Sequence, residues 1–204
     1  MGLSKSVIVP KTFLVRIGFA LWALLTLVIV GTLMVGHWYT LPKPDKDDVG
    51  LTYAIDELRG PAEQESWMAV HVLYTECRCS QRVFDHIFSS ERIKGVSEKI
   101  LLVGADAEIE KRALHSGFQV TVLTPVQLQE QFSLQAAPLL LVVNPQGTIV
   151  YSGGYTKRKQ GPDNQDIEII TSLMQEKTPQ ELPLYGCGTS AELQNLLDPL
   201  GIKY

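Results

Sequence analysis

An uncharged run of 20 residues, residues 17–36, most constrains what this 204-residue chain can fold into. A helix of this length spans a hydrocarbon core of about 30 Å. Lys5, Lys11 and Arg16 precede the run without any acidic residue. By the positive-inside tendency, these charges keep residues 1–16 in the cytoplasm and send the rest of the chain across the membrane. We therefore expect a single-pass transmembrane anchor.

The flanks of this run favour an anchor that is not cleaved. His37, Trp38 and Tyr39 suit the far interface, where amphipathic aromatic side chains collect. A cleaved signal peptide usually has an apolar region of about 7–15 residues that ends in small residues. The segment 33–36, Leu-Met-Val-Gly, fits that pattern poorly. An uncleaved signal anchor is the better interpretation.

Proline and charge then mark a connection between the anchor and a folded domain. Residues 41–50 combine two prolines with five charged residues, which predicts a semi-rigid, solvated tether. We assign residues 37–66 to this linker and a domain lead-in. Residues 67–176 have the length of one ordinary domain, and residues 177–204 form a C-terminal extension.

The charge balance excludes some partners. The formal net charge is −4, and removing the three basic residues before the anchor from 18 leaves 15 against 22 acids, or −7 for the rest. Nucleic acid and anionic membrane surfaces are therefore not expected partners. Residues 157–159, Lys-Arg-Lys, form the one basic cluster and are typical of a solvated loop.

Apolar runs predict an alternating α/β order. Residues 67–74 and 99–103 are almost continuously apolar, as in strands that are buried on both faces of a sheet. The other expected elements are a helix from about Ser80, a helix at 107–115, a strand at 118–123, a short helix at 125–131, strands at 139–143 and 148–151, and a helix capped by Asp163. This order predicts an α/β sandwich around a central mixed sheet.

Two of the three cysteines lie where the first strand meets the following helix, in the sequence Cys77-Arg78-Cys79-Ser80. A helix N-terminus offers unpaired N–H groups and a positive dipole end, which favour a thiolate. Buried cysteines often act only as small hydrophobic residues, but the polar neighbours here argue against that role. Because Cys77 precedes the helix beside Arg78, it is the better candidate nucleophile.

Three features in this order resemble the redoxin branch of the thioredoxin superfamily, and specifically its membrane-anchored, exported members. They are the cysteine at the strand-to-helix turn, Ala137-Pro138 before an apolar strand, and residues 142–150 followed by Gly153-Gly154. The resemblance covers about residues 67–174 and implies a thioredoxin-like sandwich. It also implies that Pro138 is cis, faces the reactive cysteine and, with Ala137, presents backbone to a bound substrate.

The reactive turn departs from the C-x-x-C motif of that family. With Cys77 in the nucleophilic place, Ser80 occupies the place of the resolving cysteine and Cys79 is an added thiol. Disulfide exchange needs a second thiol to release the mixed disulfide, and either Cys79 or Cys187 could supply it. A Cys77–Cys79 disulfide would close a very small, strained ring.

The sequence also predicts where Cys187 lies. Gly186 and Gly188 indicate an exposed turn, and residues 189–192 form a capping-box pattern for a helix at about 190–197. We expect the tail to fold back beside the domain and bring Cys187 to the same end as Cys77 and Cys79. The apolar side chains expected to dock it are Leu193, Leu196, Leu197, Leu200 and Ile202.

Together these patterns favour a membrane-tethered thiol-disulfide oxidoreductase that needs no cofactor and acts on protein thiols or disulfides. We place it in the bacterial inner membrane, with a cytoplasmic N-terminus, a periplasmic domain and an inner-membrane or periplasmic redox partner. Two alternatives stay open. Cys77, Cys79 and Cys187 could bind copper or zinc in a metallochaperone, or the fold could serve as a non-catalytic interaction domain. A peroxidase is less favoured, because only Thr75 matches the Pro and Thr that precede a peroxidatic cysteine.

Overall fold

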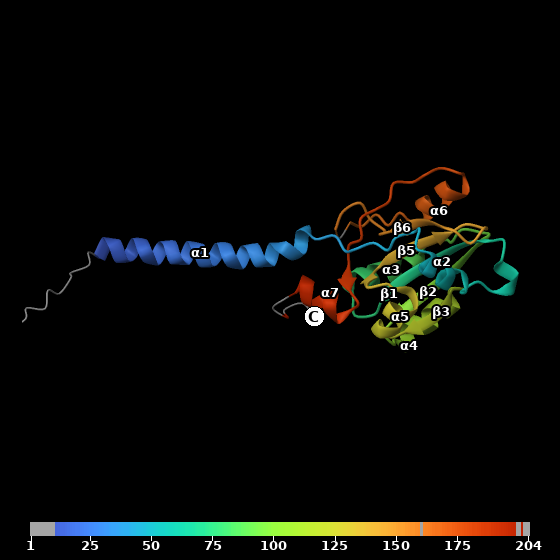
Figure 1. Cartoon of the computed structure of the whole chain (residues 1–204), viewed down its shortest axis with the longest axis horizontal. Helices are drawn as coiled ribbons and strands as arrows, with labels where there is room; N and C mark the ends of the chain where they lie inside the picture. The colour runs from blue at the N-terminus through green and yellow to red at the C-terminus, as the bar shows by residue number, and fades with distance from the viewer. Residues whose placement is uncertain (1–10, 160, 199–200, 202–204) are drawn as a thin grey trace, which may run out of the picture. The chain divides into compact units, whose positions relative to one another are not determined.

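The computed structural model describes residues 11–159, 161–198 and 201 (Figure 1). The chain divides into two units, Met1–Tyr39 and Thr40–Tyr204. In the first unit, α1 (Lys11–Trp38) begins earlier and ends later than the expected anchor. By length and composition, its segment Lys11–Thr32 is suited to crossing a membrane, and none of that segment is buried. Lys5 lies outside the described residues.

The second unit is built on a five-stranded mixed sheet in the order β3-β2-β1-β5-β6. The central strand β1 (Trp67–Tyr74) pairs in parallel with β2 (Val96–Val103), which pairs in parallel with β3 (Gln119–Leu123). On its other side β1 pairs antiparallel with β5 (Leu139–Val143), and β5 pairs antiparallel with β6 (Ile149–Gly153). The expected mixed sheet, with crossovers first and a hairpin last, is confirmed.

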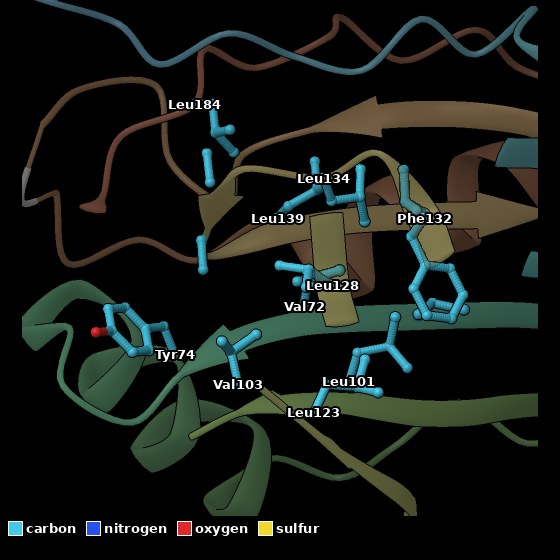
Figure 2. Close-up of a cluster of buried hydrophobic side chains, with 14 of the residues drawn as sticks. Val72, Tyr74, Leu101, Val103, Leu123, Leu128, Phe132, Leu134, Leu139 and Leu184 are labelled. Atoms are coloured by element: carbon cyan, nitrogen blue, oxygen red, sulfur yellow. The ribbon is translucent and has the colours of Figure 1, made fainter. Parts of the chain in front are cut away.

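Helices cover both faces of this sheet. The cluster on one face includes side chains from α3 (Arg78–Ser89), α4 (Ala107–His115) and α6 (Asp166–Met174). The cluster on the other face includes side chains from α2 (Val49–Asp56) and α5 (Pro125–Phe132). Figure 2 shows part of this second cluster. The apolar strands are buried on both faces because helices cover both sides.

The N-terminus of α5 lies where the sequence predicts it, whereas that of α6 does not. Thr124 caps α5 in a capping box with Gln127, as the expected start at Thr124-Pro125 requires. The predicted cap at Asp163 is wrong, because α6 begins at Asp166 and Gln165 is its N-cap residue. Asp166 is wholly buried, and its carboxylate bonds His86 of α3 and Arg92 of the following loop. Tertiary ion pairing therefore decides where this helix begins.

The expected solvated tether is packed structure. Leu41 is 5% exposed, and its N–H donates to the carbonyl of Leu184 at 2.9 Å. Lys43 and Lys46 both form ion pairs with Glu181. The prediction rested on charges and prolines. It did not account for Leu41, whose partner Leu184 lies more than a hundred positions away in the chain. The linker interpretation therefore fails for the segment that starts at Leu41.

Much of the predicted lead-in, residues 37–66, likewise belongs to the domain. Asp48 caps α2 by accepting hydrogen bonds from the N–H groups of Gly50 and Leu51. Leu51 and Ile55 are buried in the second core cluster. The short helix η1 (Pro61–Glu63) then leads into β1. A helix with a buried apolar pair cannot be a solvated connection, so the domain starts well before residue 67.

The C-terminal extension folds back onto the domain, as expected. Its strand β7 (Cys187–Gly188) pairs antiparallel with β4 (Ala136–Ala137), and α7 (Ala191–Leu197) follows. Leu193 is buried and Leu197 packs against the core. Of the other side chains expected to dock the tail, Leu196 is 64% exposed, while Leu200 and Ile202 lie outside the described residues.

Candidate active site

Cys77 is the N-cap residue of α3, immediately after β1. Its backbone N–H donates to the carbonyl of Tyr74, and its carbonyl accepts from the N–H of Gln81. The helix therefore begins at Arg78 rather than near Ser80 as expected. The Cys77 side chain is 0% exposed, and its Sγ lies 3.8 Å from the carbonyl oxygen of Ala137. The thiol thus faces the backbone that precedes Pro138.

The peptide bond between Ala137 and Pro138 is cis, as the resemblance implied. Ala137 pairs directly with Cys187 across the small β4-β7 sheet. Gly186 allows this approach, because a Cβ at that position would overlap the carbonyl of Ala137 and the ring of Pro138. The sequence suggested only a turn at Gly186, whereas the structure needs glycine there for close packing.

Cys187 is buried, at 9% exposure, so the prediction of an exposed turn is wrong. Pairing between β4 and β7 encloses its backbone, and α7 packs against β7. Its thiol hydrogen-bonds with that of Cys77. The extension therefore brings the third cysteine to the other two, as we expected from the sequence of the tail.

The surroundings of Cys77 favour its thiolate form. Hydrogen bonds from the thiols of Cys187 and Cys79, together with the N–H groups of Ser80 and Cys79, lower the pKa of Cys77 to about 3, although burial opposes them. Arg78, which was expected to contribute, is exposed. Neighbouring thiols and the helix N-terminus stabilise the charge instead.

Ser80 has a structural role here. Its side chain is wholly buried, and its Oγ accepts a hydrogen bond from the N–H of Tyr74 at 3.0 Å. This bond joins the end of β1 to the first turn of α3. Because its oxygen accepts this hydrogen bond, Ser80 stabilises the turn between β1 and α3 and does not take the part of a second redox residue.

Cys79 differs from the other two cysteines in its exposure. It lies in the first turn of α3 and is half-buried, whereas Cys77 and Cys187 are buried. It lines a small hollow of about 30 Å³ that also includes Pro138 and Arg82. Cys79 is therefore the thiol that a partner molecule meets first, next to the cis-proline.

Tyr74, at the end of β1, is a site residue that the sequence reasoning missed. Its hydroxyl donates to Glu76 at 2.6 Å. Burial and Glu76 raise the pKa of Tyr74 to about 12, and the nearby Cys187 also raises it, against a lowering by Gln194. Its position at the end of an apolar strand, three residues before Cys77, was the available signal.

The histidines do not join the thiols. His71 is wholly buried in the core and bonds Tyr155 at 2.8 Å and Glu98 at 3.0 Å. His86 pairs with Asp166 at 2.7 Å. Within the described part of the chain, no three His, Cys, Asp or Glu side chains are arranged to hold a metal ion.

These features define a thioredoxin-like fold: a mixed five-stranded sheet between helices, a cysteine at the N-terminus of α3 and a cis-proline before β5. The structure therefore has the fold that the resemblance in the sequence implied. In addition to this fold, the chain has α2 before the sheet and the β7-α7 extension after the sheet.

Similar folds occur among solved structures. An uncharacterized conserved protein from Geobacillus kaustophilus has a TM-score of 0.47 at 17% identity, covering 62% of this chain and 77% of that one. A thioredoxin-like protein solved in its oxidized form has 0.45 at 11%, covering 65% and 88%. A secreted Mycobacterium tuberculosis disulfide oxidoreductase, described as homologous to E. coli DsbE, has 0.41 at 8%, covering 54% and 84%. No family model and no curated protein matches the chain.

Proposed function

We propose that this protein is a membrane-tethered thiol-disulfide oxidoreductase that acts on protein thiols or disulfides outside the cytoplasm. The observation that carries the proposal is the meeting of Cys77, Cys79 and Cys187 at the N-terminus of α3, where Cys77 is held as a thiolate beside the carbonyl of Ala137. Exchange needs a thiolate to attack and a second thiol to resolve. This site offers a thiolate and two further thiols.

The burial of the three thiols supports an order of use that differs from the sequence-based hypothesis. Cys77 was expected to attack the substrate, yet it is enclosed, whereas Cys79 is accessible. We assign the contact with substrate to Cys79. Cys77 and Cys187 then form the inner pair, because Cys187 is the hydrogen-bond partner that lowers the pKa of Cys77 most.

The exchange proceeds in three balanced steps. Cys79 loses its thiol proton to solvent and attacks one sulfur of a substrate disulfide, so that a mixed disulfide forms and one substrate thiolate leaves. The Cys77 thiolate attacks the Cys79 sulfur, forms a Cys77–Cys79 bond and releases the second substrate thiolate. Cys187 then attacks the Cys77 sulfur, which leaves a Cys77–Cys187 disulfide and a regenerated Cys79. The substrate gains two electrons and the protein loses two, while solvent protonates the released thiolates.

A second protein must restore the dithiol form. We assign this step to a dithiol partner in the inner membrane or periplasm that reduces the Cys77–Cys187 disulfide. Helix α1 supports a tether of bacterial inner-membrane type, with the N-terminus in the cytoplasm and the domain in the periplasm. With an oxidised partner, the same three steps run in reverse and oxidise substrate thiols.

Serine substitutions in the full-length chain test the function and the order of the thiols. With a disulfide-bonded protein such as insulin as substrate, Cys77→Ser should accumulate a covalent adduct on non-reducing gels, because the resolving thiolate is gone. Cys79→Ser should form no adduct and lose at least 100-fold in rate. An unchanged rate in the variant with all three substitutions would disprove the function, and an adduct on Cys79→Ser would reverse the order.

Metal analysis separates this function from metal handling, the alternative that the cysteine pattern of the sequence left open. Protein purified without oxygen should reduce disulfides while carrying no stoichiometric metal. Stoichiometric copper or zinc that disappears in a Cys77/Cys79 double variant would favour the metallochaperone instead.

A further inference from the structure

The edge of β4, beside the thiols, is occupied by the chain's own extension. Ala137 pairs antiparallel with Cys187, and the neighbouring residue of each strand extends the pairing. The carbonyl of the same Ala137 faces the thiol of Cys77. The resemblance found in the sequence implies that a substrate lies against the backbone of Ala137. In this structure, that backbone is already paired with a strand that carries a cysteine.

The extension also encloses the reactive thiol. Cys77 is wholly buried although it is the N-cap residue of α3. The thiol of Cys187 hydrogen-bonds with that of Cys77, and Leu193 of α7 lies buried in the same core cluster. Residues 186–197, which we call the cap, therefore close the site on the side where Cys187 contacts Cys77.

The cap is held by a small set of contacts. β7 has two residues, and after it the N–H of Thr189 donates to the carbonyl of Gln135 at 2.7 Å. Leu193 is the buried residue of α7. Oγ1 of Thr189 is buried without a hydrogen-bond partner in the described part of the chain, and an unsatisfied buried hydroxyl costs free energy. Because Leu184 is wholly buried in the core, Gly186 separates a firmly packed part of the extension from a weakly held one.

We propose that the cap is an internal competitor of the substrate: docked on β4 it closes Cys77, and an extended substrate segment with glycine before its cysteine replaces it. The edge of a strand offers N–H and C=O groups to such a segment. Glycine is required because a Cβ at the position of Gly186 would overlap the carbonyl of Ala137 and the ring of Pro138. The inference rests on the proposed function and adds its regulation and a substrate sequence.

Opening of the cap is measured by alkylating Cys77 with N-ethylmaleimide in the reduced, full-length protein in detergent, followed by mass spectrometry. Leu193→Asp should raise the rate at Cys77 at least tenfold, because a charge replaces the buried side chain of α7. Leu196→Asp is the matched control and should leave the rate unchanged, since Leu196 lies on the same helix and is 64% exposed. Equal rates at Cys77 in the two variants would overturn the cap.

The alkylation rate of Cys79 separates opening of the cap from unfolding. A release confined to the cap leaves the first turn of α3 folded, so the rate at the half-buried Cys79 should change less than threefold in Leu193→Asp. Gly186→Ala gives a second way to open the cap, because its methyl group forces β7 away from Ala137. If both variants raised the rates at Cys77 and Cys79 equally, unfolding would explain the exposure and the proposal would fail.

A peptide shows whether the vacated edge of β4 binds an extended chain. The probe is a fluorescent copy of residues 184–190 in which serine replaces cysteine, and the comparison peptide has alanine in place of its first glycine. In fluorescence polarisation, Leu193→Asp should bind the glycine peptide at least tenfold more tightly than the unmodified protein does. It should bind the alanine peptide at least tenfold more weakly. Equal binding by the two proteins would overturn the competition, and equal binding of the two peptides would overturn the glycine requirement.

Rates distinguish failure of the cap from failure of the proposed function. The substrate is the disulfide-linked dimer of the probe sequence with its cysteine restored. In a single turnover, Leu193→Asp should release peptide thiol at least threefold faster than the unmodified protein, because the substrate leaves before Cys187 acts. An unchanged rate would refute competition with the substrate. If the alkylation and binding results hold but neither protein reduces the dimer, the proposed function fails and the cap stands.

Discussion

At the scale of single residues, the site depends on which atoms surround each sulfur. Cys77 and Cys79 are separated by one residue, yet one is enclosed and the other is half-buried. The difference arises because Cys77 precedes the helix and points to Ala137, whereas Cys79 is on its first turn. Thiolate stability and access to substrate are thus assigned to different residues.

Replacing Cys187 with alanine should raise the pKa of Cys77, because the hydrogen bond from Cys187 contributes most to lowering it. In the reduced protein, thiolate absorbance at 240 nm should persist as the pH falls, until it is lost near about 3. In Cys187→Ala the midpoint should lie at least one pH unit higher. Thr189→Val, in the same extension, is the control and should leave the midpoint unchanged. An unshifted midpoint in Cys187→Ala would contradict this account.

At the scale of elements, buried charges join the helices of one face to the sheet. Asp166 at the start of α6 pairs with His86 of α3 at 2.7 Å and with Arg92 at 3.0 Å. Arg92 also pairs with Glu98 of β2. Burial raises the pKa values of both carboxyl groups, but His71 and Arg92 lower that of Glu98 below its ordinary value, and His86, His71 and Arg92 lower that of Asp166. The ion pairs therefore fix how α3 and α6 sit against β2.

Asp166→Asn should destabilise the domain by about 3 kcal/mol at pH 7, because it breaks the ion pair between the buried Asp166 carboxylate and Arg92. The native pKa of Asp166 lies below the unfolded value of about 4, so its contribution is complete above that value and is lost as the pH falls. Urea unfolding of both proteins should show the gap narrowing below about pH 4. Asp163→Asn, at an exposed position, should change stability by less than about 0.5 kcal/mol. A constant gap between pH 7 and 3 would refute the electrostatic origin.

At the scale of the whole domain, the segment at its start and the C-terminal extension both contribute to the core. Leu41 at the start of the domain pairs with Leu184 of the extension, which is wholly buried. Figure 2 shows Leu184 near Leu134 and Leu139, in the same apolar cluster as Tyr74 and Val103. The extension that supplies Cys187 is therefore part of the fold, so stability and the third thiol depend on the same segment.

Leu184→Ala should cost about 2–5 kcal/mol, since truncating a buried leucine removes apolar contacts and leaves a cavity. Leu196→Ala, in the same extension but 64% exposed, is the matched control and should change stability by less than about 0.5 kcal/mol. Thermal or urea unfolding of the full-length variants measures both effects. Similar losses in the two variants, or none in Leu184→Ala, would show that the extension is not part of the cooperative core.

The sequence predicted those parts of the fold that depend on local patterns. Apolar runs located β1 and β5, and the helix at 107–115 has the expected bounds. Local chemistry also placed the cap at Thr124. It misplaced the cap of α6, because only the folded chain shows that Asp166 is needed to pair with His86 and Arg92.

The sequence alone determined the long apolar N-terminal helix, the order of strands and helices, and the presence of two cysteines at a helix start, since each follows from side chains that are close in the chain. Only the tertiary structure decided that Leu41 is buried against the domain, that Cys187 is buried beside Cys77, and that Cys79 is the most accessible of the three thiols. The reason is physical: burial and thiol contact depend on pairs such as Leu41 with Leu184 and Ala137 with Cys187. No local pattern encodes such distant pairs, because the packing of the complete domain selects them.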